Sequence, residues 1–478
     1  MNKYQKNKAC KLPTLEELRA SLSEAQGSAV REQLALLFDE KTFVETAAYT
    51  KRAFSDFLSA DGADEFESVI TGYGAIDGKL TFAFAEDSSR TGGVIDERHA
   101  KKIVDLYRMA IENGAPMIGI FNSNGTDVFE GTAGLAAYGK IMSAVAKASG
   151  VIPQIALITG KCIGTSAAIA SMFDFVVKEK GASFYVSSPA ILKTEGAQDS
   201  VLSFTADSVA CAGFVRALVS YLPSNSDIGT VCDVCTDNLN RKLGNLDFSG
   251  DAISAISVIA DNGVFYELAK DFAPSVSTVF ATLGGVKCGI VANSFAKDSG
   301  KIDCSVARKI AKFVSFCSAF SIPVVTLVDS LGLAMRAENE PDFAPELAKL
   351  AFAYANSDMP KVTVIIGHAI GAAFALLGSK ALGADVVYAT DDSEIGALTA
   401  ERGVAFAWDK YITEEKNRED LICEWKLTVS SPAVAAASGE IDDIIGTSEL
   451  RARICSALLM LANKGSSKTV ARRKVLPL

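Results

Sequence analysis

The sequence predicts an α/β protein built from two copies of one supersecondary design. Short apolar segments alternate with helical patterns along the 478-residue chain, which is typical of helices packed over a largely parallel sheet. The chain is also longer than one hydrophobic core usually supports, so two or more domains are expected. In addition, a set of landmarks recurs at one fixed spacing.

The recurring landmarks are lysines that begin helical patterns, prolines that lead into strands, and glycine turns. The pairs are Lys102/Lys309, Pro116/Pro323, Gly125/Gly332, Pro153/Pro360, Gly160/Gly367 and Gly164/Gly371, and the two numbers of every pair differ by 207. Because these pairs hold one register over about 60 residues, we infer an internal duplication.

Each element of the first copy has a local reason. Thr42–Glu45 favours a strand, and Tyr73–Lys79 indicates a hairpin because it contains an Asp-Gly step. Ala115–Ile120 and Ile152–Ile158 are short apolar runs entered through proline, which indicates buried strands.

The second copy repeats this order. Gly263–Glu267 corresponds to the first strand, and Leu283–Lys287 corresponds to the hairpin. Ile322–Leu327 and Met359–Ile365 then indicate the two buried strands. The apolar run Val362–Ser379 is therefore interpreted as a buried strand that turns into a buried helix, not as a membrane span.

The repeat and the polar segments give a division of the chain. Residues 15–22 have helical spacing, and Pro223–Gly250 is polar and turn-rich. We expect a docking helix in 1–30, a first domain in 31–225, a linker in 226–249, a second domain in 250–465 and a tail in 466–478.

Composition excludes some classes of function. The chain is 49% hydrophobic and 22% charged, with a net charge of −10. This balance is typical of a globular enzyme and argues against a nucleic-acid partner. The ten cysteines include only one C-x-x-C pair, Cys232 and Cys235, so no zinc site is expected. The polar N-terminus shows no signal peptide, and we expect a cytoplasmic protein.

The chain has only two histidines, which limits nucleophilic catalysis. His99 begins a predicted helix, where a surface or structural role is expected. His368 occupies a strand-to-helix turn, and both a structural role and a site-lining role stay open. The sequence contains no G-x-S-x-G elbow, no phosphate-binding lysine loop and no dinucleotide-binding glycine motif, so acyl-serine, phosphoryl and hydride chemistry lack support.

The two glycine turns are the remaining candidates. Gly164-Thr165-Ser166-Ala167 and Gly371-Ala372-Ala373-Phe374 both stand where a strand enters a helix. Small residues there can simply allow a helix to pack closely on a sheet. Alternatively, unpaired main-chain amides at the helix start can hold a developing oxyanion without any titratable side chain.

At these residues the sequence resembles the carboxyltransferase subunits of biotin-dependent acyl-CoA carboxylases and decarboxylases, such as propionyl-CoA carboxylase β chains. The resemblance runs from about Arg31 to Leu478 and rests on segments that occur in the right order. These are Leu36–Glu45, His99–Ile103, Gly150–Gln154, Tyr221–Asn225, Pro360–Ile365, Glu440–Ile445 and Arg451–Ile454. It implies two tandem crotonase-like domains of the ββα superhelix type, in agreement with the repeat.

The resemblance also implies a reaction and its residues. A carboxyl group would move between carboxybiotin on a separate carrier protein and a short acyl-CoA, through an enolate held by backbone amides. Carried over by position, Gly164 and Thr165 would face the thioester carbonyl, whereas Gly371 and Ala372 would face the biotin ureido oxygen. The residues expected to line the substrate sites are Ser123, Gly125, Ser166, Gly332, His368 and Ala373.

The implied partners follow from the same family. The chain lacks a Met-Lys-Met biotinylation motif, so the biotin would arrive on a biotin carboxyl carrier protein. Family members form dimers of trimers or complexes with a related subunit, and some belong to membrane-bound decarboxylases. No metal is implied.

Two loops depart from the family pattern. The first copy has Asn124–Gly131 and the second has Leu331–Glu346 where the family usually carries other motifs, and Thr165 and Ala372 replace a second glycine. A non-catalytic paralogue that binds CoA or the carrier is therefore an alternative hypothesis. A different crotonase-type reaction, with Glu130 as acid or base, is a third.

Overall fold

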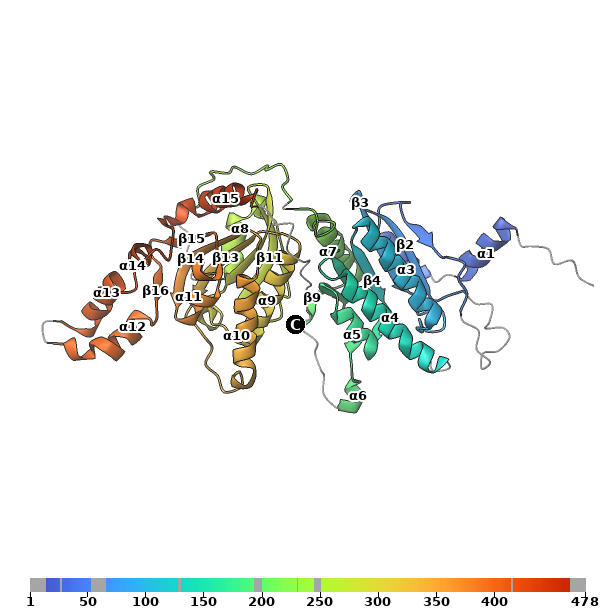
Figure 1. Cartoon of the computed structure of the whole chain (residues 1–478), viewed down its shortest axis with the longest axis horizontal. Helices are drawn as coiled ribbons and strands as arrows, with labels where there is room; N and C mark the ends of the chain where they lie inside the picture. The colour runs from blue at the N-terminus through green and yellow to red at the C-terminus, as the bar shows by residue number, and fades with distance from the viewer. Residues whose placement is uncertain are drawn as a thin grey trace, which may run out of the picture.

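The computed structural model describes residues 14–25, 28–52, 66–127, 130–192, 200–229, 231–244, 251–413 and 416–464. These residues form two halves, each with its own sheet and its own covering helices (Figure 1).

The N-terminal half contains a seven-stranded sheet in the order β1-β2-β3-β4-β5-β7-β9. Its strands are β1 Val44–Thr46, β2 Val69–Ile76, β3 Lys79–Glu86, β4 Met117–Phe121, β5 Gln154–Ile158, β7 Phe175–Glu179 and β9 Leu202–Ala206, with β6 Lys161–Ile163 and β8 Ser183–Tyr185 as a separate pair. Its helices are α1 Leu15–Ala25, α2 Ser28–Leu37, α3 Glu97–Asn113, α4 Thr132–Ala148, α5 Thr165–Ser171, α6 Pro189–Leu192 and α7 Ser208–Tyr221. From β3 onward the sheet is parallel, as expected.

The C-terminal half repeats this plan in an eight-stranded sheet. Its strands are β10 Phe265–Leu268, β11 Val276–Leu283, β12 Val286–Asn293, β13 Val324–Ser330, β14 Lys361–Ile370, β15 Val386–Thr390, β16 Glu394–Gly396 and β17 Asp443–Ile445. Its helices are α8 Ala252–Ile259, α9 Cys304–Ala319, α10 Glu340–Ala355, α11 Ala372–Leu376, α12 Ala400–Gly403, α13 Arg418–Thr428, α14 Pro432–Ala437 and α15 Leu450–Leu461. In Figure 1, α12 and α13 extend away from the sheet.

The duplication extends to individual hydrogen bonds. Strand β11 begins and ends 207 positions after β2, and β12 does so after β3. Asp96 and Asp303 cap α3 and α9 through their side chains. Lys102 donates to the carbonyl of Val69, and Lys309 donates to that of Val276. The offset becomes 211 after the glycine turns, since Ser183 of β8 corresponds to Glu394 of β16.

A continuous apolar seam joins the halves. Phe175 of β7 packs edge-on against Phe280 and Phe316, with ring centroids 6.0 and 4.7 Å apart. The hydroxyl of Tyr221 lies 3.0 Å from the carbonyl oxygen of Cys288. Since these side chains are buried and belong to one core cluster, the halves pack as one body.

Several local expectations can now be compared with the structure. The run from Val362 is a buried strand followed by helix α11, as predicted. Within the described ranges, no helix is long and apolar enough to cross a membrane. Helix α1 forms over the expected residues and is largely exposed in the single chain, so its docking role stays a prediction, as do the domain boundaries. The expected tail, 466–478, lies outside the described residues.

Candidate active site

The first glycine turn stands between β6 and α5. Gly164 has φ 59° and ψ −126°, a backbone conformation that essentially only glycine adopts without strain. Its amide donates to the carbonyl of Tyr185 at 2.9 Å. The amide left for a ligand is therefore that of Thr165, which as the first residue of α5 has no intrahelical acceptor.

The second turn has the same geometry at the end of β14. Gly371 has φ 58° and ψ −130°, and its amide donates to the carbonyl of Gly396 at 2.8 Å. Ala372 begins α11 and holds the amide that corresponds to Thr165. In both halves the glycine supplies the bend, and the next residue supplies the donor.

Both turns are open in the chain. A Cβ atom built on Gly164 meets no other atom within 4 Å, and one built on Gly371 meets only the carbonyl oxygen of Ala397, at 3.4 Å. Thr165 is exposed and Ala372 is partly exposed. The space around each glycine is thus not filled by other side chains, which is compatible with the oxyanion interpretation.

A serine orders the loop beside each turn. The Ser123 hydroxyl accepts the Gly125 amide at 3.0 Å, and the Ser330 hydroxyl accepts the Gly332 amide at 3.2 Å. Gly125 and Gly332 both have positive φ, 117° and 101°. Ser123 is buried, so it shapes the loop and does not face the solvent. Ser330 escaped the sequence analysis, although it stands 207 positions after Ser123.

A polar clamp ties each loop to the strand that enters the turn. Asn122 Oδ1 accepts the Lys161 amide at 3.1 Å, and Asp329 Oδ1 accepts the His368 amide at 2.9 Å. There is no room for a side chain at Gly367, because an added Cβ would lie 2.5 Å from Asp329 Oδ1. Sequence reasoning missed this pair, yet the same offset of 207 relates Asn122 to Asp329.

His368 lies at the second turn with a carboxylate partner. Its Nδ1 is 2.9 Å from Asp329 Oδ1, and its ring stacks on Phe295 with centroids 4.8 Å apart. The hydrogen bond to Asp329 raises the pKa of His368, which burial only partly opposes. The side chain stays one-third exposed, at 34%.

His99 takes a structural position, and the surface part of its expected role is wrong. The side chain is fully buried, with Nδ1 3.5 Å from Glu67 and Nε2 4.0 Å from Glu86. Burial raises the pKa of Glu86 to about 7, while Glu86 Oε2 accepts the Asn122 amide at 2.8 Å. This buried network supports the first clamp through the hydrogen bond between Glu86 and the Asn122 amide. His99 itself is enclosed by the protein.

Ser166 and Ala373, the second residues of α5 and α11, are both buried. Ser166 lies close to Tyr138, whose pKa is raised by burial. An added Cβ at Gly125 would lie 3.8 Å from the Tyr138 hydroxyl, so Tyr138 joins the loop to the turn. No local sequence pattern points to this tyrosine.

Glu130 makes a helix-capping contact, although burial also raises the pKa of its carboxyl. Its Oε2 accepts the amide of Glu97 at 2.9 Å, at the start of α3. This helix-capping contact weakens the hypothesis of a hydratase or isomerase.

Among the described side chains, no group of His, Cys, Asp and Glu is arranged to hold a metal ion.

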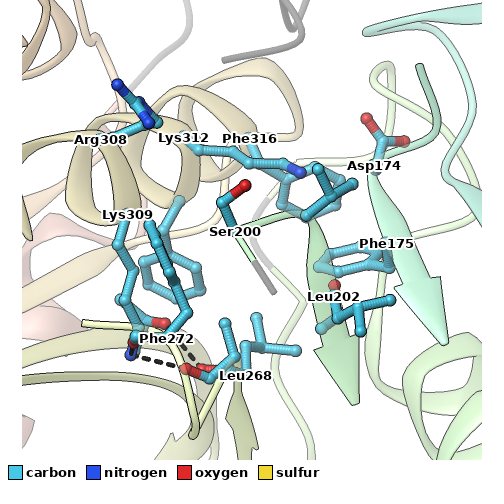
Figure 2. A pocket seen from close by; sticks show the side chains of 15 residues that line it. Asp174, Phe175, Ser200, Leu202, Leu268, Phe272, Arg308, Lys309, Lys312 and Phe316 are labelled. Atoms are coloured by element: carbon cyan, nitrogen blue, oxygen red, sulfur yellow. Dashed lines mark hydrogen bonds between the residues drawn. The ribbon is translucent and has the colours of Figure 1, made fainter. Parts of the chain in front are cut away.

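A small cavity of about 50 Å³ lies on the seam between the halves (Figure 2). Lys312 of α9 extends across it toward Asp174, which precedes β7 (Figure 2). Asp174 Oδ2 accepts the amide of Gln154, the first residue of β5. The cavity therefore lies at the N-terminal end of β5, whereas the glycine turn lies beyond its C-terminal end. The cavity is therefore separate from the candidate site.

Comparisons with known proteins agree with this geometry. A family model described as the carboxyl transferase domain matches residues 24–208 and 200–476. The methylmalonyl-CoA decarboxylase subunit alpha of Veillonella parvula is 33% identical, over 97% of this chain and 96% of that protein. The mitochondrial propionyl-CoA carboxylase beta chain of Homo sapiens is 32% identical, over 94% and 88%.

The fold is shared with a solved carboxyltransferase. The transcarboxylase 12S structure, a hexamer with methylmalonyl-coenzyme A and methylmalonic acid bound, matches with a TM-score of 0.88 and 28% identity. The match covers 98% of this chain and all of that one. The chain is thus a member of the carboxyl transferase family with two crotonase-type halves, a carboxyltransferase subunit of the biotin-dependent acyl-CoA carboxylase and decarboxylase class.

Proposed function

We propose that this chain transfers a carboxyl group between biotin on a carrier protein and a short acyl-CoA, with one glycine turn serving each substrate. The observation that carries the proposal is the family match along nearly the whole chain. The open, duplicated turns support it, because each half presents one amide donor in the same geometry.

The two halves take different substrates in this proposal. The Thr165 amide holds the thioester oxygen of the acyl-CoA as negative charge develops on it. The Ala372 amide holds the ureido oxygen of biotin, and the biotin ring is the group that carries the carboxyl. One such donor contributes about 2.7–4 kcal/mol to a transition state of this kind, enough to matter without a side-chain base.

The surrounding residues fix these donors. Ser123 and Ser330 order the adjoining loops, while Asn122 and Asp329 fasten those loops to the strands that enter the turns. Because the main chain provides the donors, Thr165 and Ala372 keep this role although neither is glycine. The departures from the family pattern are compatible with activity for this reason.

We further propose that copies of this chain assemble so that the first turn of one copy faces the second turn of another. Exposed apolar side chains on the arm formed by α12, residues 404–413 and α13 support an assembly. Phe406 is 84% exposed and Leu427 is 74% exposed in the single chain, and both are apolar side chains that an interface between copies could cover.

The test is turnover of carboxylated acyl-CoA thioesters with a biotin acceptor. Malonyl-CoA and methylmalonyl-CoA are incubated with the full chain and either free biotin or a biotinylated carrier, and the decarboxylated acyl-CoA is measured by chromatography. Biotin-dependent loss of the carboxyl group is the expected result. No turnover of either substrate with the carrier present would remove the proposal and favour the non-catalytic paralogue.

A further inference from the structure

The two clamps beside the turns differ in one chemical respect. In the first half, the neutral amide of Asn122 accepts the Lys161 main-chain amide. In the second half, the Asp329 carboxylate accepts both the main-chain amide and, at 2.9 Å, Nδ1 of His368. Only the second clamp therefore includes a histidine side chain, whereas in the first half the Asn122 main-chain amide donates to Glu86, a carboxyl whose pKa burial raises to about 7.

The Asp329–His368 clamp connects the two segments that shape the second turn. Asp329 belongs to β13, whose end continues into the loop of Gly332. His368 belongs to the last part of β14, three residues before Gly371. Loss of the ring contact would free this end of β14 to move relative to the loop.

The surroundings of His368 are mostly acidic. Glu394 pairs with it across the β14–β16 ladder, and Glu401 of α12 interacts with it electrostatically. Lys426 of α13 is the opposing cation, and Phe295 covers one face of the ring. Asp329, with its direct hydrogen bond, has the largest influence and holds the imidazole in its charged form to a higher pH than usual.

We propose that His368, charged and clamped by Asp329, is a positioning residue that makes ureido-ring binding at the second turn depend on pH through the Asp329 carboxylate. The proposal rests on the assignment of the second turn to biotin. The charge-assisted hydrogen bond from the ring holds the turn most firmly at low pH. Deprotonation at high pH leaves a neutral ring contact beside the main-chain hydrogen bond, which weakens the clamp and loosens the ureido site.

The chain itself offers a direct readout that does not need activity. Diethyl pyrocarbonate acylates only neutral imidazole, and of the two histidines His99 is fully buried whereas His368 is one-third exposed. Mass spectrometry of the full chain after brief treatment at pH 5.5–8.5 then follows His368 alone. The expected midpoint of the modification rate lies above the ordinary histidine value of about 6.5.

Two variants that each remove one carboxylate distinguish the hydrogen bond of the clamp from the electrostatic influence of carboxylates farther away. Asp329→Asn removes the hydrogen-bonded carboxylate and is expected to bring the midpoint close to or below the ordinary value. Glu401→Gln removes a nearby carboxylate that makes no contact with the ring, and is expected to leave most of the shift in place. Equal effects of both variants, or a wild-type midpoint at the ordinary value, would overturn the clamp.

Ligand protection tests the link to the ureido ring. Free biotin is expected to slow the modification of His368 at pH 6.5, and a short acyl-CoA is not. In turnover assays the KM for free biotin is expected to rise about tenfold between pH 6 and 8.5, and Asp329→Asn is expected to remove this rise. Protection by acyl-CoA alone, or a KM for biotin that does not change with pH, would overturn the proposal. If no turnover occurs, the proposed function fails, and the protection experiment still decides on the clamp.

Discussion

Replacing Gly164 by alanine tests whether the bend, and not a side chain, creates the first site. At φ 59° and ψ −126° an alanine is strained, which amounts to about 1–3 kcal/mol. An added Cβ meets no other atom within 4 Å, so no clash contributes to this value. The whole effect is conformational, and the turn can relieve it only by rotating the Thr165 amide.

Rotation of that amide removes one oxyanion donor. We therefore expect Gly164→Ala to lower kcat for acyl-CoA decarboxylation by about 10²–10³, with a loss of about 1–3 kcal/mol in the free energy of unfolding. The assays are steady-state turnover of malonyl-CoA and urea denaturation followed by circular dichroism.

Gly78→Ala is the matched control. Gly78 also has positive φ, 76°, and open space around its Cβ position, but it lies in the β2–β3 hairpin, away from the turns. The control is expected to lose stability and keep its kcat. Equal losses of kcat in both variants, or full activity in Gly164→Ala with its strain confirmed, would refute the reasoning.

Two further predictions concern buried charges. Burial raises the pKa of Asp174 from 3.8 to about 7, so its stabilising effect as a neutral acid is present below about pH 4 and is lost as the pH rises through 7. Asp174→Asn, which can still accept the Gln154 amide, should raise the free energy of unfolding at pH 8, by at most about 4 kcal/mol, and not at pH 4; parallel stability curves of the two proteins would contradict this. Arg451 is fully buried and donates to Asp261 at 2.6 Å. Arg451→Met should therefore lower the free energy of unfolding by about 3–5 kcal/mol. A loss below about 1 kcal/mol in urea denaturation would count against a structural role.

Much of the fold could be read from the sequence because duplication leaves a numerical trace. The offset of 207 that relates Gly164 to Gly371 also relates β2 to β11 and Asp96 to Asp303 in the structure. The change to 211 past the turns was not visible, since the segments there share few residue types. Apolar runs entered through proline located the buried strands, because a short β-branched run has few alternatives.

The site was only partly predictable. Glycines at strand-to-helix junctions pointed to the two bends, but which amide is free depends on partners in β8 and β16 that are distant in sequence. The buried state of His99 was also missed, because its partner Glu67 lies just before β2, 32 positions away in the sequence. Contacts of this kind arise from tertiary packing and leave no local pattern.

The central claim is that main-chain amides at the two glycine turns hold the reacting oxygens. A structure of the full assembly with a short acyl-CoA and biotin bound tests it most directly. We expect the thioester oxygen within about 2.7–3.1 Å of the Thr165 nitrogen and the ureido oxygen equally close to the Ala372 nitrogen. Either oxygen held by side chains alone, away from both turns, would contradict it.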